Sequence, residues 1–94
     1  MTKENNLQND LQGSGWFVYI LRCADDTLYT GIAKNVENRV DQHNNDNVKG
    51  AKYTRARRPV ELVYSEACDS RSSASKREYE VKQLSRAEKL LLIG

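Results

Sequence analysis

The chain has 94 residues, of which 38% are hydrophobic, and a formal net charge of +2, so it has room for one small domain. It shows neither an apolar run of membrane-spanning length nor a signal-peptide pattern, and we expect a cytoplasmic protein that does not enter a membrane. Its two cysteines, Cys23 and Cys68, have no second Cys or His at metal-ligand spacing. This spacing argues against a zinc site and favours two reduced thiols.

The first fifteen residues have the composition of a tail. Their large apolar side chains are two leucines, and they end in Gly-Ser-Gly, which is typical of a flexible linker. We therefore predict a flexible N-terminal tail over 1–15 and one folded domain over 16–94.

Two strands joined by a turn come next. Residues 16–23 and 27–33 are rich in aromatic and β-branched side chains, and the Ala-Asp-Asp-Thr cluster between them favours a hairpin turn. By the strand period of two, Tyr29 and Gly31 share one face of the second strand. Gly31 indicates a bulge, or a place where another group comes close to the backbone.

A helix is predicted over 36–44, because Asn35 is a good N-cap. Its two valines form an apolar stripe, and Arg39 and His43 lie beside that stripe, one turn apart on one helix face. By itself, this spacing is compatible with two solvated neighbours as well as with a functional pair.

A basic segment over 46–59 follows the helix. It carries five cations against one acid, a local net charge of +4, so that the rest of the chain sums to −2. Such a segment suggests nucleic acid as a partner, and a solvated flexible loop is the alternative. Tyr53 within it suits an aromatic that stacks on a base, or one that anchors the loop. The cations are Lys49, Lys52, Arg55, Arg57 and Arg58.

A third strand is predicted over 60–67, after a proline. The period of two places Val60, Leu62 and Tyr64 on one side of it.

The rest of the chain predicts two helices. The first covers 72–84 and is capped by Asp69 or Ser70, and capping-box spacing over 85–88 opens a short last helix. The resulting order, β-β-α-β-α-α, predicts an α/β (α+β) domain with a small three-stranded sheet covered by helices.

Glu78 falls on the inward stripe that Ala74 and Val81 mark on the predicted helix. An unpaired buried carboxylate is costly, so two interpretations remain. Glu78 lies at the rim and pairs with Lys82 at i+4, or it is a metal ligand, because hard divalent cations prefer carboxylate oxygen.

The candidate residues together suit phosphodiester chemistry. Arg39 can stabilise charge on a phosphate without titrating, and His43 is a natural proton acceptor near neutral pH. With a metal-binding carboxylate they would be sufficient parts for hydrolysis. Tyr19 and Tyr29 could also carry chemistry, and the alternative for each is core packing with its hydroxyl at the edge.

Taken as a set, these residues resemble the GIY-YIG nuclease domain. The two motif halves are Phe17-Val18-Tyr19 and Tyr29-Thr30-Gly31, and YTGIAKNVENRVDQH matches the family's Tyr, Gly, Asn-capped helix, Arg and His. Glu78, within KREYEVKQL, stands where the family has its metal-binding Glu. The stretch GAKYTRARRPVELVY and the SRAEK ending are similar to the short stand-alone bacterial members.

The resemblance implies a three-stranded antiparallel sheet and hydrolysis of phosphodiester bonds with one divalent ion, Mg²⁺ or Mn²⁺. Glu78 would coordinate the metal, and Tyr19 would activate the attacking water, with its proton taken by His43 or its position fixed by it. Arg39 would neutralise the pentavalent phosphate, and Tyr29 would bind phosphate or order water.

Three hypotheses follow from these observations. The first is a metal-dependent nuclease acting on DNA, directed to structures or ends in DNA repair or processing. The second is a nucleic-acid-binding module that cuts weakly, and the third is a subunit whose cleavage needs a protein partner. The basic segment is the candidate grip on nucleic acid, and its phosphate contacts would position a nucleic acid without reading its bases.

Overall fold

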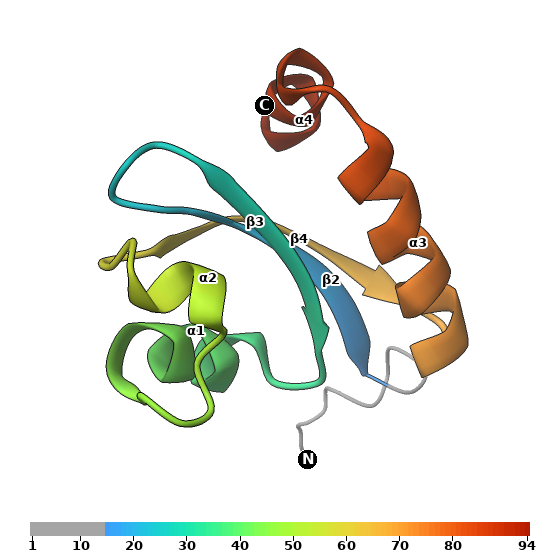
Figure 1. Cartoon of the computed structure of the whole chain (residues 1–94). Coiled ribbons are helices and arrows are strands. Elements are labelled where there is room, and N and C mark those ends of the chain that lie inside the picture. Colours follow the sequence, from blue (N-terminus) through green and yellow to red (C-terminus); the bar gives the residue numbers. More distant parts are fainter. Residues whose placement is uncertain (1–14) are drawn as a thin grey trace.

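The computed structural model describes residues 15–94, so nearly all of the predicted tail over 1–15 lies outside the described residues. Figure 1 shows a small sheet with helices on both faces. The elements in chain order are β2 (Trp16–Arg22), β3 (Leu28–Ala33), α1 (Val36–Asn45), α2 (Lys52–Arg55), β4 (Glu61–Cys68), α3 (Arg71–Gln83) and α4 (Arg86–Ile93).

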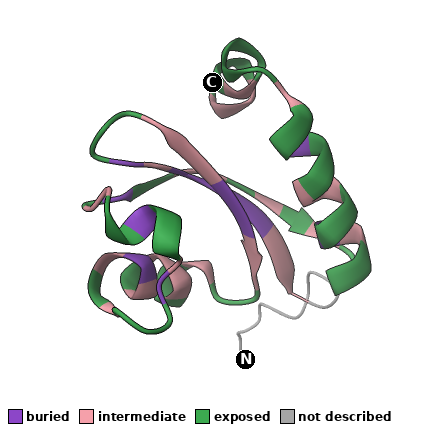
Figure 2. Ribbon diagram, in the orientation of Figure 1, coloured by how far each residue is buried: buried purple, intermediate pink, exposed green. Residues whose placement is uncertain are grey.

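The sheet has three antiparallel strands in the order β3-β2-β4. The predicted hairpin is confirmed, and its register places Tyr19 opposite Gly31 and Leu21 opposite Tyr29. Both edges of the central strand β2 are paired, and side chains from the helices cover both of its faces. Figure 2 shows it buried along most of its length. The α+β class and the three-stranded sheet are therefore as the sequence predicts.

Two separate cores lie on the two faces of β2. On one face, which we call the tyrosine face, Tyr19 and Leu21 pack with the valines of α1. On the other face, which we call the α3 face, Val18 and Ile20 pack with Ala74 of α3 and with the end of α4. Successive residues of β2 thus face opposite sides of the molecule.

The helix ends follow the capping residues. Asn35 accepts a hydrogen bond from the Asn38 amide at 2.9 Å, which satisfies a free N–H of the first turn of α1. Ser70, rather than Asp69, caps α3, and Ser85 opens α4 with the expected capping box.

The prediction that Val60, Leu62 and Tyr64 share one side is wrong. Leu62 pairs with Leu21, but Tyr64 pairs with Ile20, so Val63 is an extra residue in β4. This β-bulge reverses the alternation, and Tyr64 packs on the α3 face while Val60 packs on the tyrosine face.

The basic segment contains a helix that the sequence pattern does not predict. The helix α2 has four residues, and its Thr54 is fully buried against α1. A single turn carries too few positions for an apolar period to be visible in the sequence. Its stability comes from packing and tertiary hydrogen bonds instead.

Within residues 15–94, no helix has both the length and the apolar composition needed to cross a membrane.

Candidate active site

A row of aromatic rings lies on the tyrosine face, built from β2, β3, α1 and α2. The Tyr19 hydroxyl and His43 Nε2 are 2.8 Å apart, within hydrogen-bond distance. The His43 ring meets Tyr29 edge-on with centroids 5.2 Å apart, and Tyr29 in turn stacks on Tyr53 at 6.0 Å. We call Tyr19, His43, Tyr29 and Tyr53 the aromatic row.

Gly31 leaves room for the Tyr19 ring because it has no side chain. A Cβ added at Gly31 would lie 2.5 Å from the Tyr19 hydroxyl oxygen and 2.7 Å from Cζ. Because the two residues are register partners on neighbouring strands, the ring crosses directly over the glycine backbone. The predicted close approach is therefore confirmed.

His43, the sole histidine of the chain, is fully buried. The other residues of its helix are exposed or partly exposed. The valines of α1 pack on the tyrosine face, and this fixes the helix rotation so that His43 faces inward. Burial, assisted by the Arg39 and Arg58 cations, lowers the pKa of His43 to about 4. The imidazole is therefore neutral near pH 7.

Tyr19 has the opposite shift. Burial, with smaller contributions from Tyr29 and Glu78, raises the pKa of its phenol to about 12, and the Arg39 guanidinium opposes that shift. The phenol is therefore protonated near pH 7 unless further positive charge is brought beside it.

Arg39 is held at the edge of the aromatic row by the loop after α1. Its Nη1 donates to the Gln42 side-chain oxygen at 2.8 Å and to the Lys49 carbonyl at 2.7 Å. These two bonds fix the orientation of the guanidinium and leave its other N–H groups as donors. The side chain is therefore pre-ordered to bind an anion.

Glu78 comes from α3, on the other side of the sheet. Its carboxylate is one quarter exposed and pairs with Lys82 at 3.2 Å, the rim pairing that is one of the two interpretations drawn from the sequence. Both α1 and α3 contact β3, the edge strand, and the Glu78 charge acts on the Tyr19 pKa. The carboxylate is thus within electrostatic reach of the aromatic row without touching it.

The carboxylate of Glu78 suits a divalent ion that keeps most of its water. Among the described residues, no group of three His, Cys, Asp or Glu side chains is placed to hold a metal. Mg²⁺ characteristically binds through one or two carboxylates, water and substrate phosphate. A partly exposed carboxylate whose partner is a flexible lysine fits that mode of binding.

The predicted basic residues divide into two groups. Three arginines hold the segment together, and the clearest case is Arg58, which donates to the His43 carbonyl at 2.7 Å and to the Asp46 carbonyl at 3.0 Å. Arg55 donates to the Asn47 carbonyl. Within residues 15–94, the exposed Lys49 and Lys52 make no side-chain hydrogen bond or ion pair.

Arg57 and Tyr53 extend the aromatic row to the surface. The guanidinium of Arg57 lies 3.8 Å from the centre of the Tyr53 ring and pairs with Asp25 of the hairpin turn at 3.1 Å. Tyr53 is 39% exposed, so it both anchors the segment and presents an open edge to solvent.

Thr54 is a residue that the sequence analysis missed. Its hydroxyl lies 3.0 Å from Nδ1 of His43, and the Ala51 amide donates to the same nitrogen at 3.3 Å. A threonine in a basic segment has no periodic signal that would mark it as a partner of the distant His43.

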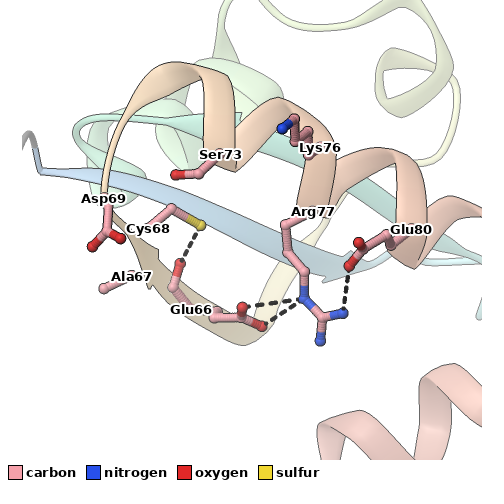
Figure 3. A pocket seen from close by; sticks show the side chains of 8 residues that line it. All are labelled: Glu66, Ala67, Cys68, Asp69, Ser73, Lys76, Arg77 and Glu80. Carbon is pink, nitrogen blue, oxygen red and sulfur yellow. Dashed lines mark hydrogen bonds and ion pairs between the residues drawn. The ribbon is translucent and has the colours of Figure 1, made fainter.

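A pocket of about 310 Å³ lies elsewhere, between the end of β4 and α3 (Figure 3). Arg77 lies in its wall and pairs with Glu66 and Glu80 at 3.1 Å. Because Arg77 is engaged by two carboxylates and none of the candidate residues lines the pocket, this pocket is not the candidate site.

A GIY-YIG catalytic domain is the family whose model matches this chain, over residues 15–90. The chain therefore belongs to the GIY-YIG family and is a member of that nuclease superfamily. The match spans every element except the last residues of α4. It includes the five predicted catalytic residues, Tyr19, Tyr29, Arg39, His43 and Glu78.

Its relatives carry the family name UPF0213. The chain is 60% identical over 78 residues to the UPF0213 protein of Desulfotalea psychrophila, covering 83% of this chain and 70% of that one. It is 58% identical over 78 residues to the UPF0213 protein of Natronomonas pharaonis, covering 83% and 89%. The relatives are bacterial and archaeal, which is a wider range than the bacterial members that the sequence resembles.

A solved structure is similar too. The solution NMR structure of a UPF0213 protein from Bacillus halodurans is 46% identical, with a TM-score of 0.52 over 83% of this chain and 81% of that one. That likeness supports the fold assignment independently of the family match.

Proposed function

We propose that this chain is a divalent-metal-dependent nuclease that hydrolyses phosphodiester bonds in DNA. The observation that carries the proposal is the buried hydrogen bond between Tyr19 and His43 at 2.8 Å, with Arg39 beside it. A tyrosine used only for packing needs neither partner. A phenol that activates water needs both a positioned neighbour and nearby positive charge.

The residues divide the work as follows. Tyr19 activates the attacking water, Arg39 neutralises charge that develops on the phosphate, and Tyr29 orders the phosphate or its water. A divalent ion, Mg²⁺ or Mn²⁺, bound by Glu78 would supply Lewis-acid stabilisation of the phosphate. The positive charge of the bound ion and of Arg39 favours the phenolate of Tyr19.

The substrate is recognised through its backbone. Lys49 and Lys52 are exposed cations in the same segment as the partly exposed Tyr53, and this combination suits phosphates with a stacked base. Such contacts do not read sequence. We therefore propose action on ends, single strands or branched structures of DNA, as in repair or processing.

A substrate panel tests this function. Single-stranded, duplex and flapped DNA and a matching RNA are incubated with the purified chain in Mg²⁺, in Mn²⁺ and in excess chelator. We expect cleavage of at least one DNA only when a metal is present. If every substrate stays intact in both metals, nuclease activity of the isolated chain is excluded.

A binding module with weak or partner-dependent cleavage is the second candidate, and the two exposed lysines favour it. It predicts DNA binding that weakens steeply with salt and does not change when Glu78 is replaced by Ala. Titration of a labelled oligonucleotide at several salt concentrations measures both properties. Cleavage that appears only after adding a protein captured with the chain would identify the partner-dependent form.

A further inference from the structure

The hydrogen bonds around His43 decide which of its nitrogens carries the proton. A neutral imidazole has one N–H donor and one acceptor nitrogen, and His43 has close partners on both sides. Nε2 faces the Tyr19 hydroxyl at 2.8 Å, and Nδ1 faces the Ala51 amide at 3.3 Å and the Thr54 hydroxyl at 3.0 Å.

The Ala51 amide is the partner whose role is fixed. A backbone N–H can only donate, so Nδ1 has to accept its hydrogen bond. A proton on Nδ1 would point at the amide hydrogen of Ala51. The partly buried Ala51 N–H would then have no acceptor. The geometry around Ala51 therefore favours an Nδ1 without a proton.

The Thr54 hydroxyl is free to donate to the same nitrogen. Its alternative acceptor is the Ala51 carbonyl at 2.9 Å, but that oxygen already accepts from the Thr54 and Arg55 amides at 3.1 Å. Because the carbonyl is satisfied by two backbone donors, the hydroxyl proton can point at Nδ1. Both neighbours then act as donors to one acceptor nitrogen.

We infer that Thr54 and the Ala51 amide hold His43 as the Nε2–H tautomer, so that His43 donates a hydrogen bond to Tyr19 and does not take its proton. The inference rests on the proposed function for its meaning in catalysis, but the tautomer itself is a property of the folded chain. Thr54 is then a positioning residue, since it acts through His43.

This assignment changes the proton path at the site. The Tyr19 oxygen accepts from His43 and lies beside Arg39, so its own proton points away from both. Because Tyr19 is only 1% exposed, that proton leaves to a water or phosphate oxygen of a bound substrate and not to His43. The resulting phenolate keeps a hydrogen-bond donor and a cation beside it. His43 stabilises the phenolate without changing its own protonation state.

Long-range ¹H–¹⁵N NMR spectra of the full chain without a histidine tag test the inference. The chain has one histidine, so its two ring nitrogens are assigned without ambiguity. At pH 7 we expect a proton on Nε2 and none on Nδ1. A proton on Nδ1 overturns the inference whether or not the chain cleaves DNA.

A pair of Thr54 variants separates the two tautomers further. In Thr54→Val the Ala51 amide still donates to Nδ1, so the Nε2–H tautomer persists. If Nδ1–H instead donated to Thr54 in the wild type, removal of the Thr54 hydroxyl would move the ring proton to Nε2 and change the spectrum. We expect kcat to fall by about fivefold to tenfold in Thr54→Val, as for one hydrogen bond, and Thr54→Ser to restore it. An undiminished kcat in Thr54→Val contradicts the positioning role.

Replacement of His43 by Gln tests the donor role in the active enzyme. The glutamine amide can donate to Tyr19 but cannot serve as a base at neutral pH. We expect Gln to retain cleavage within about tenfold of the wild type, whereas His43→Leu loses more. A loss of at least about 100-fold in the Gln variant, the size of a general-base contribution, with its fold intact, contradicts the inference.

Discussion

At the residue scale, the site depends on polar groups buried in a small core. His43 and Thr54 are fully buried, and Tyr19 is only 1% exposed. Each has a partner: His43 bonds to Tyr19 on one side and to the Thr54 hydroxyl and the Ala51 amide on the other. Their positions are therefore set by the fold before any substrate arrives, which is what a pre-organised catalytic group requires.

The burial of His43 predicts a pH-dependent stability. An unfolded histidine titrates near pH 6.5, whereas His43 in the folded chain titrates near 4. Between these values the unfolded chain binds more protons, so the free energy of unfolding rises with pH. The contribution is complete above about pH 6.5, and about 3 kcal/mol is lost as the pH falls towards 4.

Urea unfolding at a series of pH values between 4 and 7.5 measures this contribution. In His43→Gln the same window should show a much flatter dependence, because the titrating group is absent. Equal slopes in the wild type and the variant would contradict a depressed pKa at His43.

Gly31 makes a second prediction at this scale. In Gly31→Ala the new methyl group would overlap the Tyr19 hydroxyl and Cζ, and Tyr19 has no free space because it is fully packed. We expect a destabilisation of about 1–3 kcal/mol and loss of cleavage as the ring is displaced. Thermal unfolding and a cleavage assay measure the two effects. Wild-type activity in Gly31→Ala would show that the ring position does not matter.

At the element scale, the basic segment is a structural connection between α1 and β4 as well as a charged surface. Asn44 of α1 exchanges two hydrogen bonds with the Val60 backbone, at 2.9 and 2.7 Å. Arg58 bonds to the last carbonyls of α1, where a cation is favoured by the helix dipole. The cations of this segment therefore have different roles although they are adjacent in sequence.

This division predicts opposite effects for two substitutions. Arg58→Ala should lower the free energy of unfolding by about 2–4 kcal/mol, because buried carbonyls lose charge-assisted hydrogen bonds. Lys52→Ala should change stability by less than about 0.5 kcal/mol, but it should weaken DNA binding and reduce the salt slope by about 1. Urea unfolding and fluorescence anisotropy of a labelled oligonucleotide give the two numbers. The same loss of stability in both variants would contradict the division.

Local sequence patterns predict most of the elements. The hairpin, the Asn35 cap of α1 and the capping box of α4 are local signals, and each is where the sequence places it. The bulge in β4 and the helix α2 are not predictable in this way, because both depend on partners distant in the chain. Val63 is accommodated by the register of β2, and α2 by Thr54 against His43.

At the scale of the whole molecule, the candidate site is assembled from both faces of one sheet. The aromatic row and Arg39 come from the tyrosine face, and Glu78 comes from α3 on the other face. The two groups meet in electrostatic reach because β3 is an edge strand that both α1 and α3 contact. A larger sheet would separate them.

The sequence predicts these five residues through their resemblance to a family, not through spacing alone. His43 and Arg39 at i+4 give only a shared helix face, and the direct contact of His43 with Tyr19 appears only in the folded chain. The partners of His43 on its other side, Thr54 and Ala51, have no sequence pattern. Their role depends on how α2 folds back onto α1.

Cleavage by Glu78→Gln and Glu80→Gln variants tests whether Glu78 belongs to the catalytic site. Both residues lie on α3, but the Glu80 carboxylate is largely exposed and pairs with Arg77, whereas Glu78 is one quarter exposed. Cleavage of a DNA that the wild type cuts is followed over a series of Mg²⁺ concentrations. We predict that Glu78→Gln abolishes cleavage with the fold intact, and that Glu80→Gln cleaves as the wild type does. Undiminished, metal-dependent cleavage by Glu78→Gln would contradict the proposed site.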